Sequence, residues 1–94
     1  MIEINYDRDN DNVVFVAEGI FKNIIDNNEN KLQIIVAVKI KDRIKNIHMF
    51  ISDKIKKDFV CICEIKDKMQ LWGNVLEKDN SYILEVTGGQ LYEN

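Results

Sequence analysis

Residues 31–41 read KLQIIVAVKIK, and every second residue from Leu32 to Ile40 is aliphatic. Aliphatic residues with a period of two line one face of a β-strand, and the residues between them point to the other face. The next run, residues 46–51, has the same period with its odd-numbered residues apolar. The two runs therefore predict neighbouring strands that are each buried on one face.

Pairing these strands with their apolar faces together fixes the parity of the hairpin register. Paired residue numbers must sum to an odd number, because a slip of one residue would turn a core face outward. The turn then holds an even number of residues, and we expect it at residues 43–44 or 43–46. In either register Phe50 lies opposite Ala37 or Lys39 on the outer face.

The segments that precede these strands are also strand-like. Residues 2–6 predict a short edge strand, and residues 13–25 predict a long strand. Because Gly inside a strand marks a bulge or a bend, we expect the long strand to bend at Gly19. A bent first strand serves two sheets at the corner of a barrel.

The second half of the chain predicts one short helix and three further strands. Residues 52–58 are the one plausible helix, of at most two turns, because the Ser at their start suits an N-cap. The nearly continuous apolar run at residues 59–66 predicts a central strand. Residues 69–76 and 81–87 predict a hairpin, which the Gly pair at residues 88–89 ends.

The order of these elements predicts the fold. After the short edge strand, the chain has a bent strand, two strands, a short helix and two more strands. This is the order of the five-stranded Greek-key barrel called the OB-fold. We therefore predict an all-β, OB-fold-like barrel with at most one short helix between its third and fourth strands. We expect one domain over residues 1–94, since 94 residues with 46% hydrophobic content suffice for one core. An SH3-like or Sm-like barrel is the structural alternative.

The predicted core consists of apolar residues on the central strands. They are Val36, Val38, Met49, Ile51, Val60 and Ile62.

Two segments resemble the bacterial-type single-stranded-DNA-binding proteins. Residues 14–21, VFVAEGIF, look like the first strand of that family, and residues 57–64, KDFVCICE, look like its fourth strand. The family has Gly near each end of the second motif, where this chain has Lys57 and Glu64, and the family's acidic tail is missing. The resemblance implies an OB-fold and single-stranded DNA as its ligand.

The charges divide the chain into a basic middle and acidic flanks. Residues 31–68 hold ten cations and five anions, a net charge of +5, whereas residues 1–30 carry −5 and residues 69–94 carry −3. A local basic face can bind nucleic acid even when the whole chain is acidic. A solvated lysine surface is the alternative reading of the same block.

No pattern in the sequence predicts catalysis, a cofactor or a bound metal. It has no Gly-rich phosphate loop, nucleophile elbow or metal-ligand cluster, so we do not expect an enzyme. The acidic turn that holds Asp7, Asp9 and Asp11 lacks the Gly and distal Glu of a Ca²⁺ loop, and we expect it to be solvated.

The two cysteines, Cys61 and Cys63, would share one face of a strand at a spacing unsuited to a disulfide. Cys-x-Cys with a single His elsewhere is also a poor zinc site. We expect free thiols packed as small apolar groups, and hence a reducing, cytoplasmic location. No apolar run reaches about 18 residues, so we expect no membrane span.

Cations and aromatics on the outer face predict binding of single-stranded DNA or RNA with little sequence preference. Such binding needs cations along the nucleic-acid backbone and aromatic rings on which bases stack. We expect Phe50 to stack on a base, lysines to contact phosphates, and Trp72 to close the cleft. The predicted binding residues are Lys39, Lys41, His48, Phe50, Lys66, Lys68 and Trp72.

The same face also suits other functions. A protein–protein adaptor or a homo-oligomer would use Ile35, Ala37 and Phe50 as an apolar patch. A third reading is an accessory or inhibitor protein of a mobile element, whose acidic flanks mimic nucleic acid. Core packing is the competing explanation for Trp72, and burial under a loop or in a dimer interface for Phe50. Salt dependence separates nucleic-acid binding from the other uses.

Overall fold

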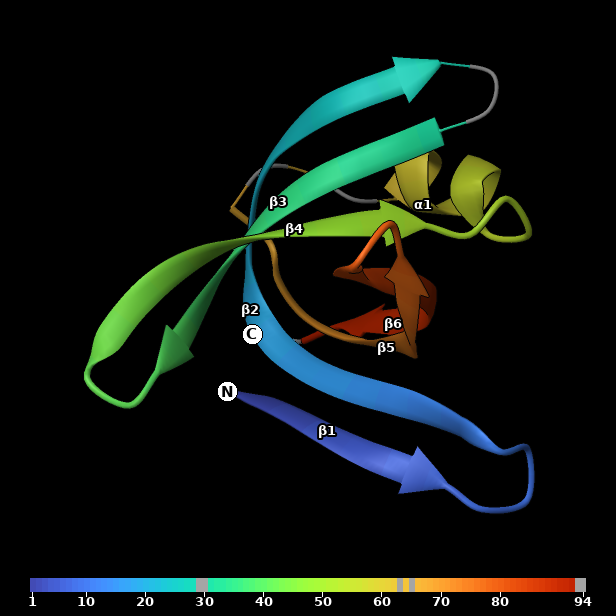
Figure 1. Cartoon of the computed structure of the whole chain (residues 1–94). Coiled ribbons are helices and arrows are strands. Elements are labelled where there is room, and N and C mark those ends of the chain that lie inside the picture. The colour runs from blue at the N-terminus through green and yellow to red at the C-terminus, as the bar shows by residue number, and fades with distance from the viewer. Residues whose placement is uncertain (29–30, 63, 65, 93–94) are drawn as a thin grey trace.

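The chain folds into a ring of strands with one short helix (Figure 1). This computed structural model describes residues 1–28, 31–62, 64 and 66–92, without the side chains of residues 26–28, 31 and 60–62. The elements in chain order are β1 (Ile2–Asp7), β2 (Asn12–Asn28), β3 (Lys31–Ile40), β4 (Arg43–Ile51), α1 (Lys56–Ile62), β5 (Lys68–Lys78) and β6 (Ser81–Leu91).

The strand order makes the barrel an OB-fold. The strands follow the order β1-β2-β3-β4-β6-β5, and an additional pairing of β2 with β5 closes the ring. All pairs are antiparallel except the short pairing of β4 with β6. β1 lies outside the ring, along the first half of β2 (Figure 1). Five ring strands with a helix between the third and the fourth confirm the predicted fold class, and β1 is the expected edge strand.

β2 curves so that it serves both sides of the barrel (Figure 1). Its first half pairs with β1 and β5, and its second half pairs with β3. Gly19 lies where the partner changes, and a Cβ there would be 2.6 Å from the carbonyl oxygen of Ala37. The register irregularities fall at residues 21–23 and 24–26. Gly19 therefore permits the close approach of β3, and the bulges expected there lie further along the strand.

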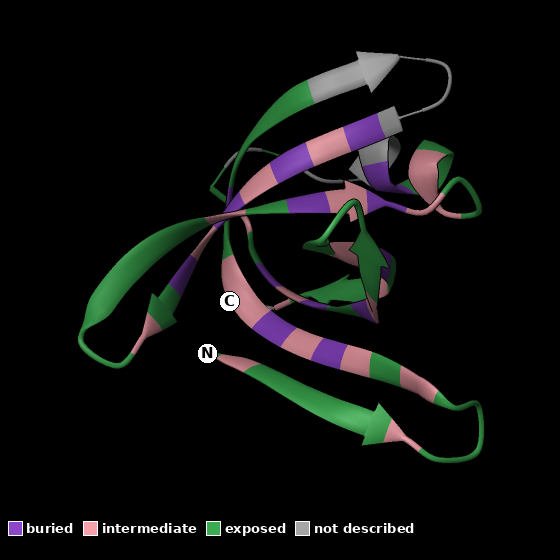
Figure 2. Cartoon of the chain, viewed as in Figure 1, coloured by how far each residue is buried: buried purple, intermediate pink, exposed green. Residues whose placement is uncertain are grey.

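The core is built from the inward residues of the ring strands. Buried and half-buried residues alternate along β2 and β3 (Figure 2), as the period of two predicts. Val36, Val38 and Met49 are fully buried, and Ile51 is 4% exposed, which confirms their predicted positions. The side chains of Val60 and Ile62 lie outside the described part of the structure.

The helix begins later than predicted, at Lys56, and continues to Ile62 in place of the central strand expected at residues 59–66. The N–H of Phe59 donates to the carbonyl of Ile55 at 2.9 Å, and the Phe59 ring packs edge-on against Phe21 with centroids 5.9 Å apart. A short apolar run is compatible with a buried helix as well as a buried strand. The strand prediction was therefore wrong, and with it the match of residues 57–64 to a family strand.

The cysteine prediction rested on that strand. Cys61 belongs to the helix, its side chain is not described, and Cys63 lies outside the described residues. The expected thiol packing stays a prediction.

The β3–β4 hairpin has the predicted parity but a different register. Its turn is Lys41-Asp42, and Gln33 pairs with Phe50. The prediction that Phe50 faces Ala37 or Lys39 was therefore wrong. The shorter turn requires Lys41 to take a left-handed φ of 56°, which is uncommon outside Gly, Asn and Asp, and this is why the sequence did not suggest it.

The β5–β6 hairpin is longer than predicted. Its turn consists of two residues, Asp79 and Asn80, whose φ angles of 51° and 63° suit the type I′ turn. β6 continues through the Gly pair that was expected to end it, and the register shifts by one residue between Trp72 and Gly73.

Candidate nucleic-acid interface

An open groove crosses the outer face of the barrel where β2, β3 and β5 meet. It has a volume of about 520 Å³. Its lining residues are Met1, Glu18, Gly19, Ile20, Ala37, Lys39, Lys41, Ile44 and Lys68. The groove thus combines an apolar floor with three lysines and one carboxylate.

The strand register explains why these residues meet. Ile20 of β2 pairs with Ala37 of β3 on one side and with Lys68 of β5 on the other. Lys39 lies two residues beyond Ala37 and therefore on the same outer face. It pairs with Ile44, which is 73% exposed. The closure of the ring by β5 brings Lys68 to lysines that are about thirty positions away in sequence.

Tyr92 organises one end of this groove. Its main-chain N–H donates to the carbonyl of Lys68 at 3.0 Å, and the Lys68 ammonium lies 5.2 Å from the centre of its ring. Its hydroxyl donates to the Glu18 carboxylate, which raises the pKa of Tyr92 above its ordinary value. One aromatic side chain therefore holds both the lysine and the carboxylate on this side of the groove.

Comparison with known proteins adds a likeness of fold. No protein-family model and no curated protein matches the sequence. The structure is similar to the solved dimeric structure of the N-terminal domain of the PriB protein from Thermoanaerobacter tencongensis, with a TM-score of 0.61 over 86% of this chain and 97% of that one. The two share a fold. Their sequences are 10% identical, so the likeness concerns architecture alone.

Three of the seven predicted binding residues line the groove, namely Lys39, Lys41 and Lys68. Trp72 lies on the same outer face of β5, four residues from Lys68, or roughly 13 Å at the rise of a strand. It is 38% exposed, opposite Val16. A Cβ on Gly88 would lie 2.3 Å from the indole Nε1, so the indole ring can pack on Gly88 only because this residue has no side chain.

The other three predicted residues lie away from the groove. Phe50 is half-buried beside Glu85, and its partner Gln33 is six residues from Lys39 along β3, roughly 20 Å. His48 is exposed on the same strand as Phe50. Lys66 is exposed before β5 with a φ of 80°. Phe50 is separated from the lysines because it pairs with Gln33, whereas the expected register would have placed it opposite Ala37 or Lys39.

Sequence reasoning missed Tyr92 and Ile44. Reading the Gly pair as the end of the hairpin left Tyr92 without a strand partner, and a register that runs through the Gly pair would have placed it opposite Lys68. Ile44 was assigned to a turn, whereas the shorter turn puts it on β4 opposite Lys39.

The acidic turn near the N-terminus is held by its own hydrogen bonds. The Asp7 carboxylate accepts from the side-chain amide of Asn10 at 2.8 Å and from the main-chain N–H of Asp9 at 3.1 Å. The bond from Asn10 is the main reason that the pKa of Asp7 lies below its ordinary value. In the described part of the chain, no three His, Cys, Asp or Glu side chains gather as metal ligands would.

No helix among the described residues is long and apolar enough to cross a membrane.

Proposed function

We propose that the chain binds single-stranded DNA or RNA across the groove, with little sequence preference. The observation that carries the proposal is the convergence of Lys39, Lys41 and Lys68 on an apolar floor. Cations beside a surface that accepts flat or apolar groups are what a sequence-tolerant binder of single strands requires. An OB-fold commonly binds oligonucleotides on its outer strand face, which makes this location suitable.

In this proposal the lysines contact phosphates and Trp72 stacks on a base. The indole is already supported by Gly88 on one side and retains solvent exposure, so stacking requires little rearrangement. Ile20 and Ala37 offer an apolar floor to sugars or bases. Every base has a π-face, so these contacts carry no strong sequence preference.

Phe50, His48 and Lys66 take part, in the same proposal, only when the strand is long. They lie outside the groove, so a short oligonucleotide held there does not depend on them. A longer strand that continues over β4 would reach His48 and Phe50.

The test measures the affinity of three proteins for a short labelled oligo-dT by fluorescence anisotropy at low salt. The proteins are the wild type, Trp72→Leu and Tyr82→Leu. Tyr82 is 77% exposed and pairs with Glu77, which is nine residues from Lys68 along β5, whereas Trp72 is four residues away. Tyr82 is therefore the matched aromatic control. Stacking on an aromatic ring is worth about 1–3 kcal/mol per base, so Trp72→Leu should weaken binding about tenfold or more while Tyr82→Leu changes little.

Absence of binding by the wild type at low salt would reject this function. The adaptor reading, which uses Ile35, Ala37 and Phe50, would then be the one to test. Equal losses for the two aromatic variants would reject the role assigned to Trp72.

A further inference from the structure

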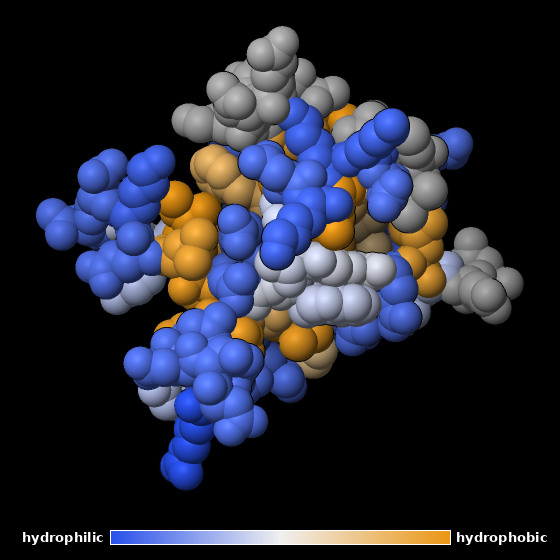
Figure 3. All heavy atoms as spheres, turned by 90° about the vertical axis from the view of Figure 1, so that its right-hand side faces the viewer, coloured by the Kyte–Doolittle hydropathy of each residue, from blue (hydrophilic) through white to orange (hydrophobic). Residues whose placement is uncertain are grey.

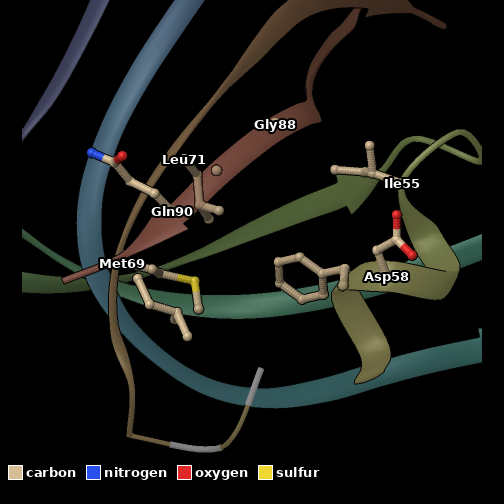
Figure 4. Close-up of a pocket in the computed structure, with 9 residues that line it drawn as sticks. Ile55, Asp58, Met69, Leu71, Gly88 and Gln90 are labelled. Carbon is tan, nitrogen blue, oxygen red and sulfur yellow. The ribbon is translucent and has the colours of Figure 1, made fainter. Parts of the chain in front are cut away.

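A second cavity, separate from the groove, opens between β6 and α1 (Figure 4). It has a volume of about 190 Å³. Its lining residues are Ile55, Asp58, Phe59, Met69, Leu71, Gly88, Gly89, Gln90 and Leu91. Met69 and Leu71 are 1% and 2% exposed, so buried apolar side chains form its floor. The cavity suits one apolar side chain.

The backbone of β6 is open beside this cavity. β4 pairs with β6 only at Glu85 and Val86, so the later part of β6 has β5 as its one strand partner. The N–H of Tyr92 bonds to Lys68 of β5, and antiparallel ladders alternate between bonded and non-bonded pairs. Gly89 and Leu91 therefore turn their N–H and C=O groups away from β5. Among the described residues, no hydrogen bond from another element reaches these groups.

The Gly pair adds no side chain to this edge, and side chains of β5 pack where the two Cβ atoms would stand. The missing Cβ of Gly89 would lie 2.7 Å from the Leu71 side chain, and that of Gly88 would lie against the Trp72 ring. Two successive residues thus present backbone without side chains. An unprotected edge of this kind is a template for a further strand.

One carboxylate stands at the mouth of the cavity. Figure 4 shows Asp58 and Ile55 on the helix side and Met69 and Leu71 on the strand side. Asp58 is exposed, and within the described part of the chain it makes no ion pair or side-chain hydrogen bond. The mouth therefore favours a cation on whatever enters the cavity.

We infer that this site binds an extended peptide segment of a partner protein by strand addition to β6. Main-chain hydrogen bonds form at Gly89 and Leu91, and one apolar side chain of the peptide enters the cavity. A cationic side chain two positions away, on the same face of the peptide strand, pairs with Asp58. This is the recognition mode in which backbone pairing supplies affinity and alternate side chains supply specificity. It is independent of the groove on the outer face.

The charges disfavour two of this chain's own strand edges as the occupant. They are the open edges of β1 and of the first part of β4. On β4 the exposed Ile44 has Asp42 and Asn46 two positions away, which would bring a carboxylate towards Asp58. On β1 the exposed Ile4 has only apolar and tyrosine neighbours at that spacing. The face seen in Figure 3 also carries its hydrophobic residues in separate patches among hydrophilic groups, unlike a broad dimer interface.

The experiment uses two labelled threonine-rich peptides, TTTLTRT and TRTLTTT, with fluorescence anisotropy as the readout. One of the two orders should bind, and replacing its leucine by asparagine should weaken binding about tenfold, as expected for an apolar anchor. Replacing its arginine by glutamate should weaken binding too. Backbone N-methylation should abolish binding when it is placed on one alternating set of peptide residues, odd-numbered or even-numbered, and should spare binding when it is placed on the other set.

The charge contact is tested with Asp58→Asn and its control Asp53→Asn, which removes an exposed carboxylate just before the helix. Asp58→Asn should reduce the preference for arginine over glutamate by roughly fivefold, whereas Asp53→Asn should preserve it. Strand addition is wrong if neither peptide binds better than its variant with asparagine in place of leucine. It is also wrong if the peptides N-methylated at odd and at even positions bind equally. If both Asp variants behave alike, the assigned role of Asp58 is wrong.

Discussion

Gly73 is the residue at which the packing leaves the least room for a side chain. A Cβ there would lie 1.8 Å from the carbonyl oxygen of Glu85, next to the bulge in β6. Because backbone atoms cannot move aside as a flexible side chain can, Gly73→Ala should lower the free energy of unfolding by about 1–3 kcal/mol or more. Urea denaturation should show a lower midpoint with an unchanged slope. An unchanged midpoint would contradict the close approach.

Tyr92 and Tyr6 should ionise above the ordinary tyrosine pKa. Tyr92 donates to Glu18 and Tyr6 donates to Asp11, and in each case the bond to the carboxylate is the main cause of the raised pKa. A raised folded-state pKa means that this contribution to stability is complete below pH 10 and is lost as the pH rises through the folded value.

Alkaline titration by tyrosinate absorbance, compared among wild type, Tyr92→Phe and Tyr6→Phe, measures this directly. Each substitution should remove one late-ionising group from the curve. If both tyrosines ionise at or below 10.0, the hydrogen bonds to the carboxylates are wrong.

At the scale of elements, the sequence predicts the strands well where one face alone is buried. The aliphatic period of β3 predicts its buried face correctly, because alternation is a direct consequence of the pleat. Residues 59–62 were misassigned because a short run that is apolar on all sides has no period to distinguish a helix from a strand. Turn positions depend on backbone angles such as the left-handed φ of Lys41, which side-chain patterns do not encode.

The β3–β4 hairpin offers a test that separates stability from binding. Lys41 has a φ of 56°, and a left-handed conformation costs a non-Gly residue about 1–2 kcal/mol. Gly avoids this cost but loses more entropy on folding, so Lys41→Gly should leave stability unchanged or raise it by up to about 1 kcal/mol. Since Lys41 lines the groove, the same variant should weaken binding of short oligo-dT.

Lys66→Gly is the matched control for this prediction. Lys66 is also exposed and left-handed, with a φ of 80°, but it does not line the groove. Its variant should show a similar change in thermal midpoint without the loss of affinity for a short strand. A large loss of stability in Lys41→Gly would show that the lysine side chain supports the hairpin.

At the scale of the molecule, the candidate site could be predicted only in part. Lys39 lies at the end of β3 and Lys41 in the turn directly after it, so their proximity follows from the sequence. Lys68 joins them because β5 closes the ring beside β2, a pairing that no local pattern specifies. Phe50 was placed beside the lysines by registers that differ from the real one by four or six residues. A shift of that size preserves the buried face, so hydrophobicity cannot detect it.

The whole-molecule charge distribution gives the last prediction. If three lysines of the groove contact phosphates, the logarithm of affinity for oligo-dT should fall with the logarithm of salt concentration with a slope of about −2, from roughly −0.7 per contact for single strands. Lys68→Ala should make this slope shallower by about 0.7. Lys78→Ala removes an exposed lysine from the opposite end of β5, outside the groove, and should leave the slope unchanged. Because counterion release depends on the contacts and not on the net charge of −3, a strongly negative slope would locate binding at a basic surface of an acidic protein. Equal effects of the two lysine variants would instead show that binding depends on overall charge and not on the groove.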